Sequence, residues 1–452
     1  MSPAQGLPSP SNPSNPSKLL RGDLLPRIVA PPPGPRSREL SAGLDRFLAP
    51  GISTIVSGEP SLVWEEALGS NVLDVDDNVF LDLTAGFGVA SIGHRRPEVV
   101  AAVADQAARL IHALGDVAAH SARLDLARRL ADRAPVGSEA DDLQVFFAVS
   151  GADAVEIALK TALAATEKPG VVAFDPGYHG LSLGALAVTS REEFRAPFAP
   201  HLHRHVERFA FGGPLDALAA RLDRRDVGAV IFEPIVGREG VLLPPPGWLT
   251  SLAEITRRAG ALLIADEIFT GFGRTGYRFA VEAEGIRPDL LCCGKALGGG
   301  LPIAAVLGSR DLFAVWRTSG EARHTATFVA HPLACAAALA ALDVLDEERL
   351  PARSLALGAA FLPRLSSWPE RFSAVAAVRG RGLLWGVELK TPLAAKRCVS
   401  GALARGVLLL AGGPASTVAQ IAPPLTISSQ QLDAAFDILE AVLSSVSRER
   451  EP

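Results

Sequence analysis

The stretch DLLCCGKALGGGLP (289–302) decides the fold and points to its chemistry. An apolar run from Leu291 to Cys293 precedes Lys295, and three consecutive glycines (298–300) follow it. The run predicts a buried strand, and the glycines predict a turn at its carboxyl end. The chain has only six lysines, and arginine, which carries most of the basic charge, cannot act as an amine nucleophile. A lysine in this setting suits an amine that forms a Schiff base with an aldehyde.

Similar apolar runs alternate with helical patterns between residues 120 and 345. They are QVFFAV (144–149), GVVAF (170–174), GAVIFEP (228–234), GALLIAD (260–266) and DLLCCG (289–294). Strands without polar alternation are usually buried on both faces, so we predict an α/β fold with a mainly parallel sheet flanked by helices. Upstream, the apolar spacing over 97–114 predicts a helix.

The carboxyl ends of these strands carry polar or aromatic residues, namely Ser150, Tyr178, Glu233, Asp266 and Lys295. In sheets of this kind, ligands bind beyond the carboxyl ends of the strands. We therefore expect the five side chains to belong to one site.

Ser150, Gly151 and Ala152 open a strongly helical segment. The free N–H groups at a helix N-terminus bind anions, and a glycine lets the anion approach closely. The segment thus predicts a phosphate site, with the alternative of a Ser/Asp helix cap that binds no ligand.

Asp266 ends an apolar strand, where an unpaired carboxylate is costly. A pyridinium nitrogen would supply the missing cation, and the aromatic ring of Tyr178 is of the kind that stacks on a planar cofactor. The alternatives are a capping acidic pair with Glu267 and an ordinary loop aromatic. Together with Lys295 for the aldehyde, the pattern predicts pyridoxal 5'-phosphate.

Composition restricts the function classes. The net charge of −5 gives no basic field for nucleic acid or an anionic membrane. No segment reaches the roughly 20 apolar residues of a membrane span, and the N-terminus lacks the apolar core of a secretory signal. The four cysteines follow no metal-ligand spacing, so we expect reduced core residues, no metal site and a cytoplasmic location.

Seven segments form a more specific pattern. They are SGADAVEIALK, GYHG, FEPIVGREG, LLIADEIFTGFGRTG, GKALGGGLPIAAVLG, TATFVAHPLACAAALA and VRGRGLLWGVEL. The chain resembles the class-III aminotransferases, the family of ornithine and 4-aminobutyrate aminotransferases, from about residue 60 to the C-terminus. The resemblance implies a type I pyridoxal-phosphate-dependent transferase fold, whose large domain contains a mainly parallel seven-stranded sheet. It also implies a homodimer with active sites shared between subunits.

The resemblance further implies a small α+β domain built from both chain ends, which sets the domain limits that we expect. We expect a disordered or extended Pro/Ser-rich tail over 1–36, the N-terminal part of the small domain over 37–95, the large domain over 96–345, and the C-terminal part of the small domain over 346–452.

Matching the family's motifs assigns roles residue by residue. Lys295 matches the Schiff-base lysine, and Asp266 matches the partner of the pyridine nitrogen. The other matches are Ser150, Gly151 and Ala152 for the phosphate loop, Tyr178 for ring stacking, Glu233 for the ring substituents, and Thr327 for a phosphate-binding threonine from the neighbouring subunit.

Three positions depart from the family at the substrate side. Leu181 and Gln420 stand where relatives often carry carboxylate-binding arginines. Arg238 stands where the family has a glutamate that switches on and off the arginine found at the position of Gln420. Arg238 is therefore a candidate for a relocated carboxylate ligand, with pairing to Glu239 as the alternative. Phe87 lies where relatives contact substrate and suggests an apolar side chain.

The leading hypothesis is a pyridoxal-phosphate-dependent aminotransferase that moves an amino group from an amino acid or amine to a 2-oxo acid through a Lys295 Schiff base. One alternative is an amino-acid racemase or epimerase on the same scaffold. It is credible because Gln420 replaces the arginine that binds the 2-oxo acid in relatives. A second is a non-catalytic scaffold or regulatory protein, against which the presence of Lys295 and Asp266 argues.

Overall fold

The computed structural model describes residues 20–51, 59–137, 142–317 and 320–448. At its centre lies a seven-stranded sheet with the strand order β4-β10-β9-β8-β7-β5-β6. Its strands are β4 (Leu143–Ala148), β5 (Gly170–Asp175), β6 (Val206–Ala210), β7 (Val227–Phe232), β8 (Leu262–Asp266), β9 (Leu290–Cys293) and β10 (Ala304–Ser309). Strand β10 is antiparallel to β4 and β9, and the other pairs are parallel. The predicted mainly parallel seven-stranded sheet is confirmed.

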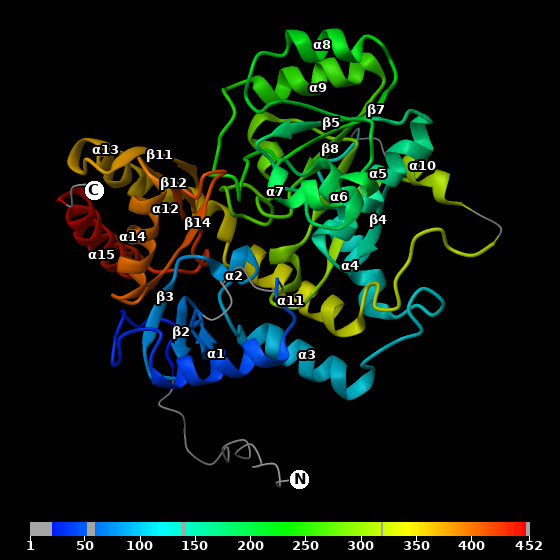
Figure 1. Cartoon of the computed structure of the whole chain (residues 1–452). Helices are drawn as coiled ribbons and strands as arrows, with labels where there is room; N and C mark the ends of the chain where they lie inside the picture. The colour runs from blue at the N-terminus through cyan, green and yellow to red at the C-terminus, as the bar shows by residue number, and fades with distance from the viewer. Residues whose placement is uncertain (1–19, 52–58, 138–141, 318–319, 449–452) are drawn as a thin grey trace, which may run out of the picture.

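Helices cover both faces of this sheet, as Figure 1 shows. One face packs against α5 (Gly151–Thr166), and the other packs into the core formed with α3 (Pro97–Arg109), α4 (Ser121–Ala131), α9 (Trp248–Ala259) and α11 (Pro332–Glu347). Adjacent residues of a strand therefore enter different cores: Cys292 lies on the α5 side and Cys293 on the other. Covering both faces explains why these strands are apolar without alternation.

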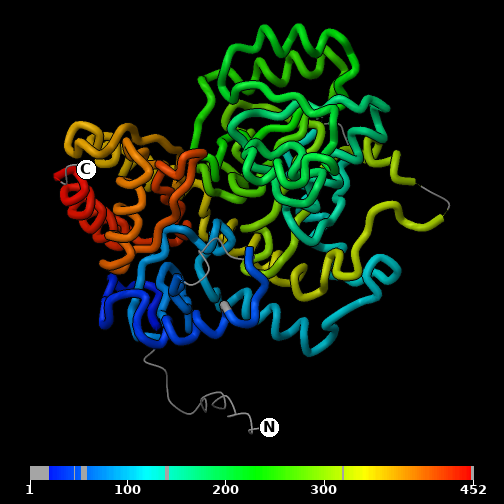
Figure 2. The backbone as a smooth tube through the Cα atoms, viewed as in Figure 1, coloured from blue at the N-terminus to red at the C-terminus, as the bar shows by residue number. Residues whose placement is uncertain are grey.

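The rest of the molecule is built from both ends of the chain. One sheet, in the order β1-β2-β3-β13, joins β1 (Trp64–Leu68), β2 (Asn71–Asp74) and β3 (Val79–Asp82) to β13 (Val407–Leu408). The other, in the order β11-β12-β15-β14, contains β11 (Val375–Arg381), β12 (Leu384–Leu389), β14 (Leu410–Gly412) and β15 (Val418–Ile421). Figure 2 shows the blue N-terminal and red C-terminal segments in this same half. The domain limits 37–95 and 346–452 are a proposal for dividing the two halves.

Shorter elements and surface helices complete the fold. The α-helices are α1 (Pro35–Phe47), α2 (Ala85–Gly88), α6 (Leu183–Val188), α7 (Glu192–Arg195), α8 (Asp216–Leu222), α10 (Arg310–Phe313), α12 (Leu350–Ser366), α13 (Trp368–Arg371), α14 (Pro392–Leu403) and α15 (Ser429–Arg448). The 3-10 helices are η1 (Ala196–His201), η2 (Ala280–Glu284), η3 (Lys295–Gly298) and η4 (Ala314–Trp316). Of the helices in these described ranges, none has the length and apolar character needed to cross a bilayer.

The helix predicted over 97–114 ends at Arg109, so its last turn was wrong; Leu110 is extended, and Ile111 is exposed. The four cysteines are buried and unpaired, as predicted. Residues 1–19 of the expected tail lie outside the described residues, whereas Leu20 is buried and Arg27 pairs with Val79 through backbone hydrogen bonds.

Candidate active site

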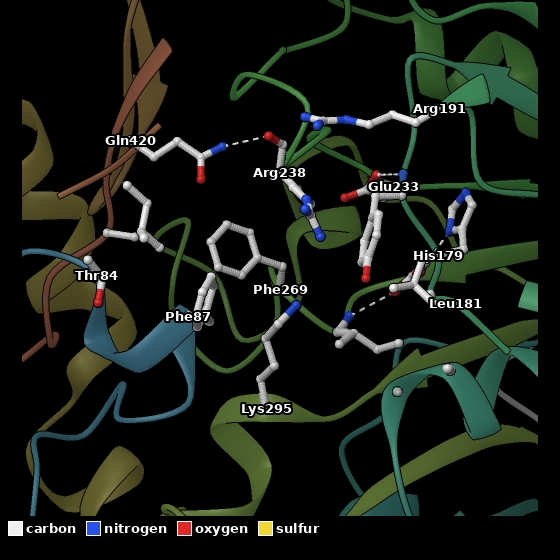
Figure 3. A pocket seen from close by; sticks show the side chains of 18 of the residues that line it. Thr84, Phe87, His179, Leu181, Arg191, Glu233, Arg238, Phe269, Lys295 and Gln420 are labelled. Atoms are coloured by element: carbon white, nitrogen blue, oxygen red, sulfur yellow. Dashed lines mark hydrogen bonds and ion pairs between the residues drawn. The ribbon is translucent and has the colours of Figure 1, made fainter. Parts of the chain in front are cut away.

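A cavity of about 950 Å³ lies at the carboxyl edge of the central sheet (Figure 3). Its walls come from the ends of β5, β7, β8 and β9, the start of α5, and segments of the other half of the molecule around residues 83–87 and 410–422. The expected site residues that line it are Gly151, Ala152, Tyr178, Glu233, Asp266, Lys295, Phe87, Arg238 and Gln420. The fold thus brings residues from distant parts of the sequence to one cavity.

Lys295 follows β9 after one intervening residue, Gly294, and points into this cavity (Figure 3). Its Nζ lies 4.7 Å from the centroid of the Phe269 ring. Burial lowers the pKa of Lys295, and the charge of Arg238 lowers it further, while Asp266 and Glu233 act in the opposite direction. A lowered pKa leaves more of the amine unprotonated, which makes it a better nucleophile.

Asp266 ends β8 as a buried carboxylate. Its Oδ2 lies 2.7 Å from Nδ1 of His179, and its Oδ1 accepts a hydrogen bond from the Ile268 N–H at 3.1 Å. Burial alone would lower the pKa of His179, but its hydrogen bond to Asp266 and the charges of Asp266 and Glu233 outweigh that effect and raise it. The two side chains therefore form a buried hydrogen-bonded pair in the wall of the cavity.

No chemistry was expected of His179 from the sequence, so its pairing with Asp266 was missed. Its position immediately after Tyr178, just past the carboxyl end of β5 at the same edge of the sheet as Asp266, was the signal that could have found it.

Glu233 links two of the loops that form the cavity. Its Oε1 accepts a hydrogen bond from the Tyr178 N–H at 2.9 Å, and its Oε2 accepts one from the Gly237 N–H at 3.1 Å. Burial raises the pKa of Glu233 to about 7, with the charge of Asp266 adding to the shift and His179 opposing it. Glu233 thus holds the loop with Tyr178 against the loop that follows β7.

The start of α5 supplies backbone donors. Gly151 and Ala152 line the cavity, and N–H groups in the first turn of a helix have no acceptor within the helix. Gly180 approaches so closely that a Cβ built on it would lie 2.6 Å from the Cβ of Ala152. Ser150 is exposed and its Oγ accepts a hydrogen bond from the Asp153 N–H at 3.2 Å, so it caps the helix. Gly151 and Ala152 are therefore the members of this loop that face the cavity.

Thr327 is not brought to this cavity. Its side chain is exposed, and its carbonyl oxygen lies 2.9 Å from the position of a Cβ built on Gly115. Within one chain, the threonine expected at the phosphate lies outside the site.

The residues that line the cavity fit pyridoxal 5'-phosphate. The N-terminus of α5 suits its phosphate, the buried carboxylate of Asp266 suits a protonated ring nitrogen, and the amine of Lys295 suits its aldehyde. Tyr178 and Ile268 line the same cavity and offer flat and apolar surfaces for the ring.

The substrate side of the cavity contains Arg238. Its guanidinium carbon lies 4.5 Å from the centroid of the Tyr178 ring, and its Nε is 4.0 Å from Oε1 of Glu239. Glu239 is buried and accepts hydrogen bonds from Nε of Arg191 at 2.8 and 2.9 Å. The alternative of a close Arg238–Glu239 pair is therefore weak, because Glu239 already has a nearer cation.

Gln420 lies opposite, on β15. Its Nε2 donates hydrogen bonds to the backbone carbonyls of Gly237 and Arg238, each at 2.8 Å. Phe87 is 61% exposed and, with Leu181, forms part of the apolar wall.

Phe269 is a further lining residue that the sequence analysis missed. A Cβ on Gly88 would lie 2.8 Å from its ring, and one on Gly237 would lie 2.3 Å away. The two glycines thus make room for a ring that contacts Lys295. Its place three residues after Asp266 was the available signal.

The family model described as "Aminotransferase class-III" matches residues 54–443. An acetylornithine aminotransferase from Methanosarcina mazei is 37% identical over 406 residues, which cover 89% of this chain and 98% of the relative.

Among solved structures, the ornithine aminotransferase from Toxoplasma gondii ME49 aligns with a TM-score of 0.84 at 29% identity, covering 92% of this chain and 96% of that one. An amine transaminase from an uncultivated Pseudomonas species, in its PLP-bound form, aligns with a TM-score of 0.78 at 29% identity, covering 89% of this chain and 98% of that one.

Proposed function

Since the chain belongs to the class-III aminotransferases, and so is an aminotransferase, we propose that its cavity binds pyridoxal 5'-phosphate on Lys295 and uses it to move amino groups. The observation that carries the proposal is the meeting of Lys295, Asp266 and the start of α5 in one cavity. The matched family and relatives are aminotransferases, so they support transamination and not the racemase alternative.

The bound cofactor would supply an electron sink for the negative charge that develops at the reacting carbon of the substrate. Lys295 Nζ would bind the carbonyl carbon of the cofactor in the resting enzyme and then move the proton at the substrate carbon. Its lowered pKa supports both roles, because the base must be unprotonated when it accepts that proton.

The remaining residues of the site would orient the cofactor and hold it in place. Asp266 would keep the ring nitrogen protonated, and His179 would fix the carboxylate in place through the 2.7 Å hydrogen bond. The N–H groups of Gly151 and Ala152 would bind the phosphate, and Tyr178 would stack on the ring. Glu233 would position Tyr178 through the Tyr178 N–H and lie near the ring substituents.

The substrates belong to two classes, an amino acid or amine as donor and a 2-oxo acid as acceptor. Acetylornithine and ornithine are the first donors to test, because relatives are named for them. Leu181 in the apolar wall also admits donors with uncharged side chains.

We also propose a homodimer. Ile111, Leu114, Val117 and Phe328 are each at least 60% exposed, and the ring of His112 lies 5.5 Å from that of Phe328, so the two segments adjoin. An exposed apolar patch of this kind suits a subunit interface. The exposed Thr327 lies next to Phe328, which supports a role for it at the partner's cofactor. Light scattering should give a dimer, and Val117→Glu should shift it toward monomer; a monomeric wild type would refute this part.

Four buried, unpaired cysteines support a reducing, cytoplasmic location.

The test of the function is a single-turnover experiment. The protein is loaded with pyridoxal phosphate and freed of excess cofactor, and each donor is added without a 2-oxo acid. We expect one equivalent of oxo acid or aldehyde per active site, together with pyridoxamine phosphate, and reversal when a 2-oxo acid is added. Loss of the donor's chirality without any oxo product would contradict transamination.

A further inference from the structure

The charges around the cavity allow an inference about substrate selection. We infer that the enzyme prefers 2-oxo acids with a single carboxylate, which Arg238 binds, and that Gln420 disfavours a second carboxylate. This inference rests on the proposed transamination and names the acceptor class of the same site.

Arg238 is the cation in the described lining that is left for a carboxylate. Arg191 also lines the cavity, but its Nε bonds to Glu239 and its Nη2 donates to the Gly413 carbonyl at 2.7 Å. His179 is paired with Asp266, and Lys295 is reserved for the chemistry. The guanidinium of Arg238 instead lies over the Tyr178 ring with its side chain 37% exposed.

Gln420 presents an acceptor and not a donor. Its Nε2 is used by the carbonyls of Gly237 and Arg238, and two carbonyl acceptors require the amide nitrogen on that side. The Oε1 atom is therefore turned toward the cavity, as Figure 3 shows. An amide oxygen accepts hydrogen bonds and repels a carboxylate.

The same two hydrogen bonds give Gln420 a second role. They hold the backbone of residue 238, from which the guanidinium extends over Tyr178. Gln420 is thus a positioning residue for the cation as well as a source of repulsion.

Among the described residues, the rest of the wall offers a second carboxylate no further side chain of opposite charge. Apart from the groups already discussed, its side chains are apolar or hydroxyl-bearing, namely Leu83, Thr84, Phe87, Leu181, Phe194, Leu410, Ala411, Ser416 and Ala422. A carboxylate desolvated in such surroundings without a cation is disfavoured. A monocarboxylate such as pyruvate leaves no charge unpaired, whereas 2-oxoglutarate leaves one.

The experiment measures kcat/KM for pyruvate and for 2-oxoglutarate with one donor. We expect pyruvate to be favoured by about tenfold to 100-fold in the wild type. Gln420→Arg adds a cation where the amide oxygen stood, so it should raise kcat/KM for 2-oxoglutarate relative to pyruvate, mainly through KM. Arg238→Gln should raise KM for pyruvate more than it lowers kcat.

Gln431→Ala is the matched control. The Nε2 of Gln431 also donates to two backbone carbonyls, of Gly22 at 3.0 Å and Leu24 at 3.1 Å, but it lies outside the cavity lining. Loss of these two hydrogen bonds should leave the ratio of kcat/KM for pyruvate to that for 2-oxoglutarate unchanged.

A wild type that uses 2-oxoglutarate within threefold of pyruvate would overturn the inference. So would a Gln420→Arg protein that melts like the wild type and keeps its ratio. If that variant does not fold, the inference is tested by competitive inhibition of the wild type with propionate, a monocarboxylate, and glutarate, a dicarboxylate. Stronger inhibition by glutarate contradicts the inference. If the proposed function fails, the donor half-reaction alone yields no oxo product, which distinguishes that failure from an unexpected acceptor preference.

Discussion

Replacing Asp266 by asparagine removes one negative charge from the floor of the cavity while nearly preserving its shape. The carboxylate is 4% exposed and lies 2.7 Å from His179, so its interactions are those of a desolvated charge. A hydrogen bond to a charged group is worth about 1.5–3 kcal/mol, against about 1 kcal/mol for a neutral one. If the cofactor loses about 1–2 kcal/mol of binding free energy at its ring nitrogen, the Kd of pyridoxal phosphate should rise about 5-fold to 30-fold.

Turnover should fall further than binding, because the charge also stabilises the reacting state. Losing one such preorganised electrostatic group typically costs about 100-fold to 1000-fold in kcat. The assays are equilibrium dialysis of the cofactor against the cofactor-free protein, and steady-state kinetics at saturating cofactor.

Glu267→Gln is the control, since Glu267 is the next residue and is also buried. It faces away from the cavity, where its Oε1 accepts a hydrogen bond from the Val281 N–H at 2.8 Å and its Oε2 accepts one from Thr270. This variant should keep the cofactor Kd and kcat within about threefold of the wild type, as expected of a group that acts outside the site. A role of the Asp266 charge at the cofactor is contradicted if Asp266→Asn leaves both the Kd and kcat unchanged, or if Glu267→Gln impairs them equally.

Lys295→Ala should abolish turnover with an unchanged far-ultraviolet circular dichroism spectrum, and measurable wild-type activity in it would contradict the proposed chemistry. Gly180→Ala should destabilise the protein by about 2 kcal/mol or more, because φ is +126° and the new Cβ would overlap α5, whereas Gly285→Ala, at φ +64° with open space around it, should cost only about 1–2 kcal/mol in urea unfolding. Burial raises the pKa of Glu233 and of Glu267 to about 7, above the ordinary 4.5, so the folded state binds protons more tightly and the cofactor-free protein should lose stability as pH rises from about 4.5 through 7. Thermal melts at pH 5.5 and 8 test this, and Glu267→Gln should reduce the difference; a higher melting temperature at pH 8 would oppose it.

The sheet could be predicted because its strands are apolar on both faces. The run expected over 289–294 is β9 (Leu290–Cys293), and the one expected over 228–234 is β7 (Val227–Phe232). The end of α3 could not be predicted from periodicity, since Leu110 and Ile111 are apolar without facing the core. Nor could the antiparallel direction of β10, because it depends on pairing with β4 and β9 across the sheet.

The part of the site that lies at the carboxyl ends of strands could be predicted from the sequence. Lys295 and Asp266 each follow an apolar run, so sequence alone directs both to one edge of the sheet. The partner of Asp266 is 87 residues away along the chain, and only the arrangement of β5, β7 and β8 in the folded sheet shows that His179 reaches it. The direction of the Gln420 amide likewise depends on which backbone carbonyls lie beside it. Long-range contacts of this kind leave no local pattern in the sequence.

The most direct test of the central claim is to find the lysine that holds the cofactor. The protein, loaded with pyridoxal phosphate, is reduced with borohydride, digested, and analysed by mass spectrometry. We expect the mass of the reduced cofactor on Lys295 alone among the six lysines. The same mass on another lysine, or on none, would contradict it.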